Sequence, residues 1–209
     1  MSGRGDVHSP AMATPSGPKR FPPPFYAFAA TLVRYFVAIF YGLRVTGREH
    51  VPRHGGCVVA SNHVSAWDPP VVGCTTPREI HFMAKKELFE DWLSRRVYRG
   101  LRAFPVDRQA NDVGAIKEAL RRLQRGYAIG VFFEGPRNLT GDARAQEGAA
   151  FLAQRAGVPL VPAAIWREGR RFRVAFGPPL PPPGKGRDEA ARTTEELVRA
   201  VRAMIPSST

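Results

Sequence analysis

Residues 57–70 read Cys-Val-Val-Ala-Ser-Asn-His-Val-Ser-Ala-Trp-Asp-Pro-Pro. The first four residues form a short apolar run, as expected for a strand that is covered on both faces. The run ends in a polar turn at Ser61-Asn62-His63, and Asp68-Pro69-Pro70 is typical of the cap and first turn of a helix. We therefore expect a buried strand, a turn with polar side chains, and a helix that starts soon after the turn.

Strand and helix patterns alternate after this stretch. Strands are predicted at residues 80–83, 103–106, 128–133, 160–165 and 173–176, and helices at residues 90–101, 112–125, 147–156 and 188–204. The clearest helix is 112–125, which Asp112 caps and Gly126 closes. The alternation predicts one α/β domain over residues 45–209, with a largely parallel central sheet flanked by helices. Open sheets of this kind bind ligands at the carboxyl ends of their strands.

Composition limits the classes of function. A chain of 209 residues with 44% hydrophobic residues can bury one substantial core. Its net charge of +13 attracts nucleic acid, anionic lipid or coenzyme phosphates. No nucleic-acid-reading motif accompanies the charge, so we expect no nucleic-acid partner. Cys57 and Cys74 have neither CxxC nor zinc-ligand spacing, so no metal site and no disulfide framework is predicted.

The N-terminal part differs from the rest. Residues 1–24 are rich in Gly, Ser and Pro, which predicts a disordered leader. Residues 25–44 are predominantly apolar and about long enough to span a bilayer. Arg34 lies at their middle, and a central arginine costs roughly 2.5–3.5 kcal/mol on insertion scales. A narrow stripe of small and polar residues recurs at helical spacing: Ala27, Ala30, Thr31, Arg34, Ala38 and Tyr41.

We therefore predict a membrane-interfacial helix over residues 25–44, with this stripe toward water or the domain. A transmembrane helix and a helix docked on the core are the alternatives. A signal peptide is disfavoured because Arg34 interrupts the apolar region and no clear small-x-small cleavage site follows.

Two polar clusters fall at the ends of predicted strands. The first runs from Asn62 to Asp68 and the second, Phe-Glu-Gly-Pro-Arg, occupies residues 133–137. His63 is a candidate general base, Asp68 its orienter, and Arg137 a candidate anion-binding residue. This combination suits acyl transfer to an alcohol that carries a phosphate.

Five sequence blocks, taken in order, resemble the glycerolipid acyltransferase family, the 1-acyl-glycerol-3-phosphate acyltransferases (PlsC-like). They are Ser-Asn-His-x4-Asp at 61–68, Phe-Met-Ala-Lys-Lys-Glu-Leu-Phe at 82–89, Phe-Pro-Val-Asp-Arg at 104–108, Phe-Glu-Gly-Pro-Arg at 133–137 and Gly-Val-Pro-Leu-Val-Pro at 157–162. Any one block is weak evidence, whereas the ordered set is specific. The similarity extends from about Gly47 to about Pro179.

The resemblance implies an O-acyltransferase that moves a fatty acyl group from acyl-CoA or acyl carrier protein to a lysophospholipid hydroxyl. Lysophosphatidic acid, which would become phosphatidic acid, is the first candidate acceptor. His63 would act as base in one direct transfer, with no cofactor besides the acyl donor as co-substrate. An acyl-serine path through Ser61 or Ser65 is disfavoured because neither lies in a G-x-S-x-G elbow. The implied location is peripheral on the cytoplasmic membrane, with the active site on the cytosolic side.

Family position also implies a set of phosphate-binding residues: Arg137, Glu134, Gly135, Lys85 and Arg108, with Asn62 and Pro162 as supporting motif residues. Arginine binds phosphate through two parallel hydrogen bonds, whereas lysine acts as a point charge. Glu134 would orient an arginine or accept a hydrogen bond from a glycerol hydroxyl. A simple ion pair between Glu134 and Arg137 is the alternative.

The family block usually reads Phe-Pro-Glu-Gly-Thr-Arg, and here Phe133 replaces the proline and Pro136 the threonine. Proline removes a hydroxyl and a backbone N–H that phosphate binding would use. The acceptor therefore stays open between lysophosphatidic acid, another lysophospholipid and an amino-acid-containing lysolipid. A noncatalytic module that binds anionic lipid is a further alternative, although it leaves the His63–Asp68 pair unexplained. The sequence does not indicate an oligomeric state.

Overall fold

The computed structural model describes residues 23–107, 112–134 and 143–206, so nearly all of the predicted leader lies outside the described residues. The strands are β1 Leu43–Thr46, β2 Cys57–Asn62, β3 Ile80–Lys85, β4 Phe104–Val106, β5 Ala128–Glu134, β6 Leu160–Glu168 and β7 Arg171–Phe176. The α-helices are α1 Pro24–Phe40, α2 Asp68–Thr75, α3 Trp92–Gly100, α4 Val113–Gln124, α5 Ala143–Ala156 and α6 Arg187–Met204. Two 3-10 helices, η1 Arg48–His50 and η2 Lys86–Phe89, complete the set.

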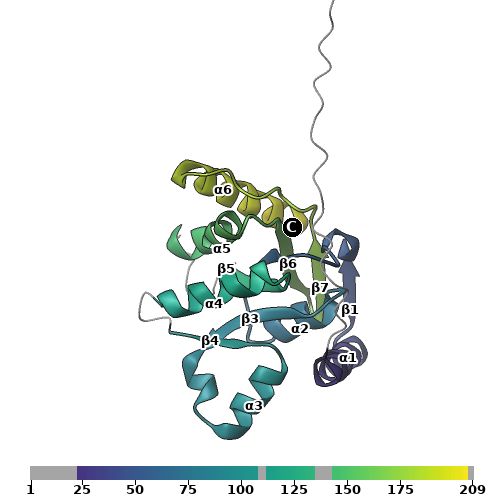
Figure 1. Cartoon of the computed structure of the whole chain (residues 1–209). Helices are drawn as coiled ribbons and strands as arrows, with labels where there is room; N and C mark the ends of the chain where they lie inside the picture. Colours follow the sequence, from purple (N-terminus) through teal and green to yellow (C-terminus); the bar gives the residue numbers. More distant parts are fainter. Residues whose placement is uncertain (1–22, 108–111, 135–142, 207–209) are drawn as a thin grey trace, which may run out of the picture.

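The seven strands form one sheet in the order β1-β7-β6-β2-β5-β3-β4. All neighbouring strands are parallel except β6 and β7, which form an antiparallel pair. Figure 1 shows α4, α5 and α6 along one side of this sheet and α2 on the other side. The predicted α/β domain with a largely parallel sheet flanked by helices is confirmed.

The central strand β2 contributes to two hydrophobic cores. Val58 and Ala60 pack in the core with α4, α5 and α6, whereas Cys57 and Val59 pack in the core with α1 and α2. Successive side chains of a strand point to opposite faces, so a strand with helices on both sides must be apolar throughout. Both cysteines are buried free thiols, and burial raises the pKa of Cys57 and of Cys74 to about 11.

Several boundaries differ from the predictions. β2 continues to Asn62, one residue before the histidine, although the turn was expected to begin at Ser61. Asp68 begins α2, but its carboxylate binds the preceding loop and does not cap the helix. β1 was not predicted, and among the described strands it pairs with the distant β7 alone. α5 begins at Ala143, one turn earlier than expected.

Helix α1 docks on the domain through one side. Tyr26 and Val37 are buried, and the Tyr26 hydroxyl accepts a hydrogen bond from the backbone N–H of Ile80 at 3.1 Å. Burial raises the pKa of Tyr26 to about 12. The docking side is therefore set by Tyr26 and Val37, not by the stripe that includes the exposed Arg34. Seven large side chains of α1 are exposed: Phe25, Phe28, Leu32, Tyr35, Phe36, Ile39 and Phe40.

Within the described residues, no helix has the length and apolar character that crossing a bilayer requires.

Candidate active site

The first polar cluster lies beside the described part of the second, Phe133 and Glu134, at one edge of the sheet. β2 ends at Asn62, β5 ends at Glu134, and these two residues are partners in the parallel register. His63 therefore leaves β2 beside the end of β5. β3, the next strand after β5, ends at the same edge with the exposed Lys85. These are the carboxyl ends of neighbouring strands, where open α/β sheets bind ligands.

Asp68 holds one side of the His63 ring. Nδ1 of His63 lies 2.9 Å from Oδ2 of Asp68, whose side chain is only 1% exposed. The same oxygen accepts hydrogen bonds from the backbone N–H groups of Val64, at 2.6 Å, and Ser65, at 2.8 Å. Because a carboxylate oxygen can only accept, Nδ1 carries a proton, and in the neutral imidazole Nε2 then keeps its lone pair. Nε2 has no hydrogen-bond partner among the described residues.

Aromatic rings support the other side of His63. The imidazole lies against Phe132 of β5 with ring centroids 4.6 Å apart, and Phe132 stacks on Phe82 of β3 at 5.5 Å. The His63 side chain is 25% exposed, so it is packed on two sides and still reachable from solvent. A ring that is fixed through Nδ1 and reachable at Nε2 is the arrangement that a general base needs.

Asn62 fixes the point at which β2 stops pairing with β6. Its Nδ2 donates to the carbonyl of Ile165 at 2.7 Å, and its Oδ1 accepts from the N–H of Ile165 at 2.8 Å. The backbone pairing of β2 with β6 ends at Ser61–Ala163, and the register with β5 shifts between Ser61 and Asn62. The Asn62 amide thus takes the place of the next backbone pair. We predicted Asn62 only as a motif residue, since nothing near it in sequence indicates Ile165 as its partner.

Replacing Asn62 by alanine is expected to lower the free energy of unfolding by about 2–4 kcal/mol, because both backbone groups of Ile165 lose a buried partner. Turnover should fall as well, since the start of the His63 loop is no longer fixed. Urea unfolding and steady-state rates measure the two effects. Ser61→Ala is the matched control, because the buried Ser61 hydroxyl has no hydrogen-bond partner among the described residues. An N62A protein as stable as the S61A protein would contradict this role.

The structure describes only some of the remaining predicted site residues. Arg108, Gly135 and Arg137 lie outside the described residues, as does Pro136, and the structure describes Glu134 by its backbone alone. Lys86, next to Lys85, pairs with Asp107, whose hydrogen bond and charge raise the pKa of Lys86.

Pro162 lies in β6 opposite Ala60 of β2. Its carbonyl accepts from the N–H of Gly177, beyond the end of β7, at 2.9 Å. A backbone N–H at this position would point to the same side as that carbonyl, beyond the last β6–β7 pair, Ala163–Phe176. Proline therefore removes no hydrogen bond between paired residues of the two strands.

A family model described as Acyltransferase matches residues 42–166, more than half of the chain. The chain belongs to the acyltransferase family. The 1-acyl-sn-glycerol-3-phosphate acyltransferase of Bacillus subtilis (strain 168) is 34% identical over 165 residues, which cover 74% of this chain and 82% of that protein. The human 1-acyl-sn-glycerol-3-phosphate acyltransferase beta is 32% identical over 130 residues, which cover 59% of this chain and 46% of that protein.

This acyltransferase also shares its fold with a solved structure, that of the 1-acyl-sn-glycerophosphate (LPA) acyltransferase PlsC from Thermotoga maritima. The two have a TM-score of 0.68 and 23% sequence identity, and the match covers 88% of this chain and 81% of that chain. The resemblance read from the five sequence blocks is confirmed, and so is the assignment of the chain as an O-acyltransferase-family enzyme.

Proposed function

We propose that this acyltransferase moves a fatty acyl group from acyl-CoA or acyl carrier protein to the free hydroxyl of lysophosphatidic acid, which gives phosphatidic acid. The names of its relatives support the acceptor. The observation that carries the chemistry is the 2.9 Å hydrogen bond between Nδ1 of His63 and Oδ2 of Asp68. It leaves Nε2 as the proton acceptor at the edge of the sheet.

In the proposed reaction, Nε2 of His63 takes the hydroxyl proton while the oxygen attacks the carbonyl carbon of the thioester. The new C–O bond forms, the C–S bond breaks as the tetrahedral intermediate collapses, and the proton passes from Nε2 to the departing thiolate. Asp68 keeps the Nδ1 proton in place and stabilises the imidazolium. The buried position of Ser61 argues against an acyl-serine intermediate there, so S61A should keep its activity.

A panel of lysolipid acceptors with one acyl-CoA tests this function through the amount of CoA released. We expect the highest rate with lysophosphatidic acid. A higher rate with another lysophospholipid or with an amino-acid lysolipid would change the acceptor and leave the chemistry in place. Binding of anionic vesicles without CoA release on any acceptor would favour the noncatalytic module.

We also propose that the enzyme is peripheral on the cytosolic face of the cytoplasmic membrane, which it contacts through both α1 and α3. Helix α3 exposes Trp92 by 71% and Leu93 by 54%, next to the exposed Arg96. The C-terminal end of α3 adjoins α1, since a Cβ on Gly100 would meet the ring of Phe25 at 2.6 Å. In Figure 1 the two helices lie at the same lower side of the molecule. Apolar side chains beside arginine suit a surface that contacts anionic lipid.

Two exchanges to serine in either helix should weaken binding to anionic vesicles by roughly 10²- to 10⁴-fold, since each apolar side chain contributes about 1.5–3 kcal/mol when buried. The variants are Phe28→Ser with Phe40→Ser in α1, and Trp92→Ser with Leu93→Ser in α3. Val113→Ser with Ile116→Ser is the control, because these side chains are exposed on α4. Co-sedimentation measures binding. Undiminished binding of the α3 variant would remove α3 from the contact surface.

Truncation of α1 is a poorer test, since it would also take Tyr26 and Val37 out of the core.

A further inference from the structure

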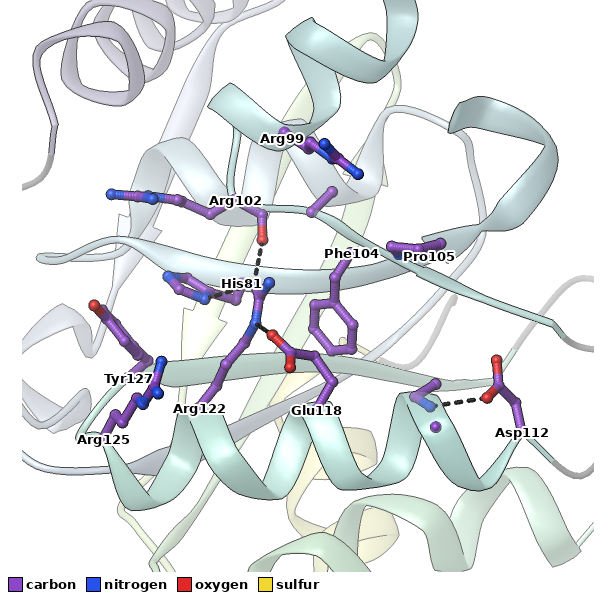
Figure 2. A pocket seen from close by; sticks show the side chains of 13 residues that line it. His81, Arg99, Arg102, Phe104, Pro105, Asp112, Glu118, Arg122, Arg125 and Tyr127 are labelled. Carbon is purple, nitrogen blue, oxygen red and sulfur yellow. Dashed lines mark hydrogen bonds and ion pairs between the residues drawn. The ribbon is translucent and has the colours of Figure 1, made fainter. Parts of the chain in front are cut away.

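A cavity of about 660 Å³ lies away from the His63 cluster, between α3, β4 and α4 (Figure 2). His81, near the start of β3, and Tyr127, just before β5, form part of its wall. The register aligns the amino ends of β2, β5 and β3, because Cys57 and Ile80 both pair with Ala128. His81 and Tyr127 therefore mark the amino ends of these strands, whereas His63 follows the carboxyl end of β2. The cavity is a separate place on the molecule.

The cavity wall carries more positive than negative charge. Its cations come from the end of α3, the turn before β4, the second half of α4 and the residue that follows α4: Arg99, Arg102, Arg122 and Arg125. Its two acids already have partners, because Asp112 accepts from the N–H of Ala115 at the start of α4 and Glu118 pairs with Arg122. The guanidinium groups of Arg99 and Arg125 form no hydrogen bond or ion pair with any other described residue. Two guanidinium groups at this wall thus lack a counter-charge.

Arg122 is the buried centre of the cluster. Figure 2 shows its guanidinium between His81 and Glu118, and it lies 4.4 Å from the ring centroid of Phe104. It donates to the carbonyl of Arg102 at 3.0 Å. Burial, followed by repulsion from Arg102 and Arg121, lowers the pKa of Arg122 to about 10. Arg122 is therefore a half-buried cation that Glu118 pairs and that neighbouring arginines repel.

Arg102 is held in an unfavourable backbone conformation beside this cation. Its φ of 65° is the single positive value among the described residues other than glycine. That conformation turns the Arg102 carbonyl to Arg122. Strained residues of this kind persist where the surrounding structure requires them, often at binding sites.

His81 holds Arg122 from the side of β3. Its Nδ1 accepts from Arg122 at 2.9 Å, so Nε2 carries the proton. Nε2 is buried and faces the carboxylate of Glu79, whose Oε1 is 3.7 Å away, beyond hydrogen-bond distance. Burial lowers the pKa of His81; the nearby Glu79 opposes this effect, and the charges of Arg122 and Arg102 add to it. Its ring stacks on Tyr127 with centroids 4.5 Å apart.

We propose that this cavity binds a phosphate-bearing anion, with Arg99 and Arg125 as its free cations and the buried Arg122–His81 pair as its inner wall. Arginine is suited to this task because its planar fork matches two phosphate oxygens. The volume accommodates a phosphate together with the group it is attached to. The phosphate can belong to a lipid headgroup that reaches the cavity beside α3, or to a soluble nucleotide.

The test measures binding in an Arg137→Gln background, which removes the cation predicted for the acyl acceptor. Adenosine 3′,5′-bisphosphate, followed by calorimetry, probes the soluble source. Vesicles of phosphatidylcholine with and without phosphatidic acid, followed by co-sedimentation, probe the lipid source. The test variant is Arg99→Gln with Arg125→Gln. The control is Arg187→Gln with Arg199→Gln, which removes the same charge from two exposed positions on α6.

The R99Q/R125Q protein should bind at least one probe about 10- to 100-fold more weakly, whereas the control pair should change affinity by less than about twofold. If the R99Q/R125Q protein loses affinity for the nucleotide alone, or for phosphatidic acid alone, that probe identifies the source of the phosphate. Equal loss in both pairs would mean that net charge alone attracts the probes, and would overturn the proposal. The proposal would also be overturned if neither probe bound to the Arg137→Gln protein. Because no acyl transfer is measured, the result is independent of the proposed reaction.

Discussion

His63→Ala is expected to lower kcat by about 10²–10⁴ without unfolding the protein, because it removes the proposed base. The ring makes one hydrogen bond, to Asp68, and Oδ2 of Asp68 keeps its two backbone donors when the ring is gone. We therefore expect Tm to change by less than about 4 °C, the shift that a 1 kcal/mol change produces in a domain of this size.

CoA release and thermal melting measure these two quantities on the same preparation. His54→Ala serves as the control, since His54 is exposed and lies outside the cluster. A wild-type rate in H63A would reject His63 as the base. A large fall in Tm would show that the variant reports on folding and not on the reaction.

The second large effect is expected for Asp68→Asn, which removes the negative charge of the side chain but can keep its hydrogen bonds. All three donors converge on Oδ2, while Oδ1 is buried without a partner among the described residues. An asparagine that places its carbonyl oxygen at the Oδ2 position keeps all three hydrogen bonds and loses only the negative charge. The reverse orientation would set an NH2 group against three donors.

The lost charge is worth about 4 kcal/mol to an imidazolium at roughly 4 Å and an effective dielectric constant of about 20, which corresponds to about 10³ in kcat. Asp68→Ala removes the acceptor as well, and should lower Tm by about 6–12 °C for a loss of about 3 kcal/mol. Rates and melting curves of both variants are the measurement. A wild-type rate in D68N would show that Asp68 orients the ring and contributes no charge.

Elements whose signals lie within their own residues could be predicted from the sequence. Helix α4 was predicted at 112–125 and spans Val113–Gln124. Asp112 accepts from the N–H of Ala115, and Gly126 adopts the left-handed conformation that ends many helices. The His63–Asp68 contact is of the same local kind, because the loop between them is closed by hydrogen bonds to Asp68 itself.

Features that depend on a distant partner could not be predicted. β1 has four residues, and its pairing with β7 is visible only in the folded sheet. The same holds for the hydrogen bonds of Asn62 with Ile165 and of Tyr26 with Ile80. The polar groups of a side chain do not indicate which distant residue they will contact. The phosphate-binding roles of Arg108 and Arg137 stay predictions, because both residues lie outside the described residues.

The burial of both cysteines makes the enzyme convenient to assay and to label. Thiol reagents attack the thiolate, and at neutral pH a thiol with a pKa of about 11 is almost entirely protonated. Cys57 and Cys74 should therefore contribute little background when a thiol-reactive dye detects released CoA. A cysteine introduced at Trp92 should react selectively with an environment-sensitive fluorophore, whose emission would report on α3 as it meets a lipid surface.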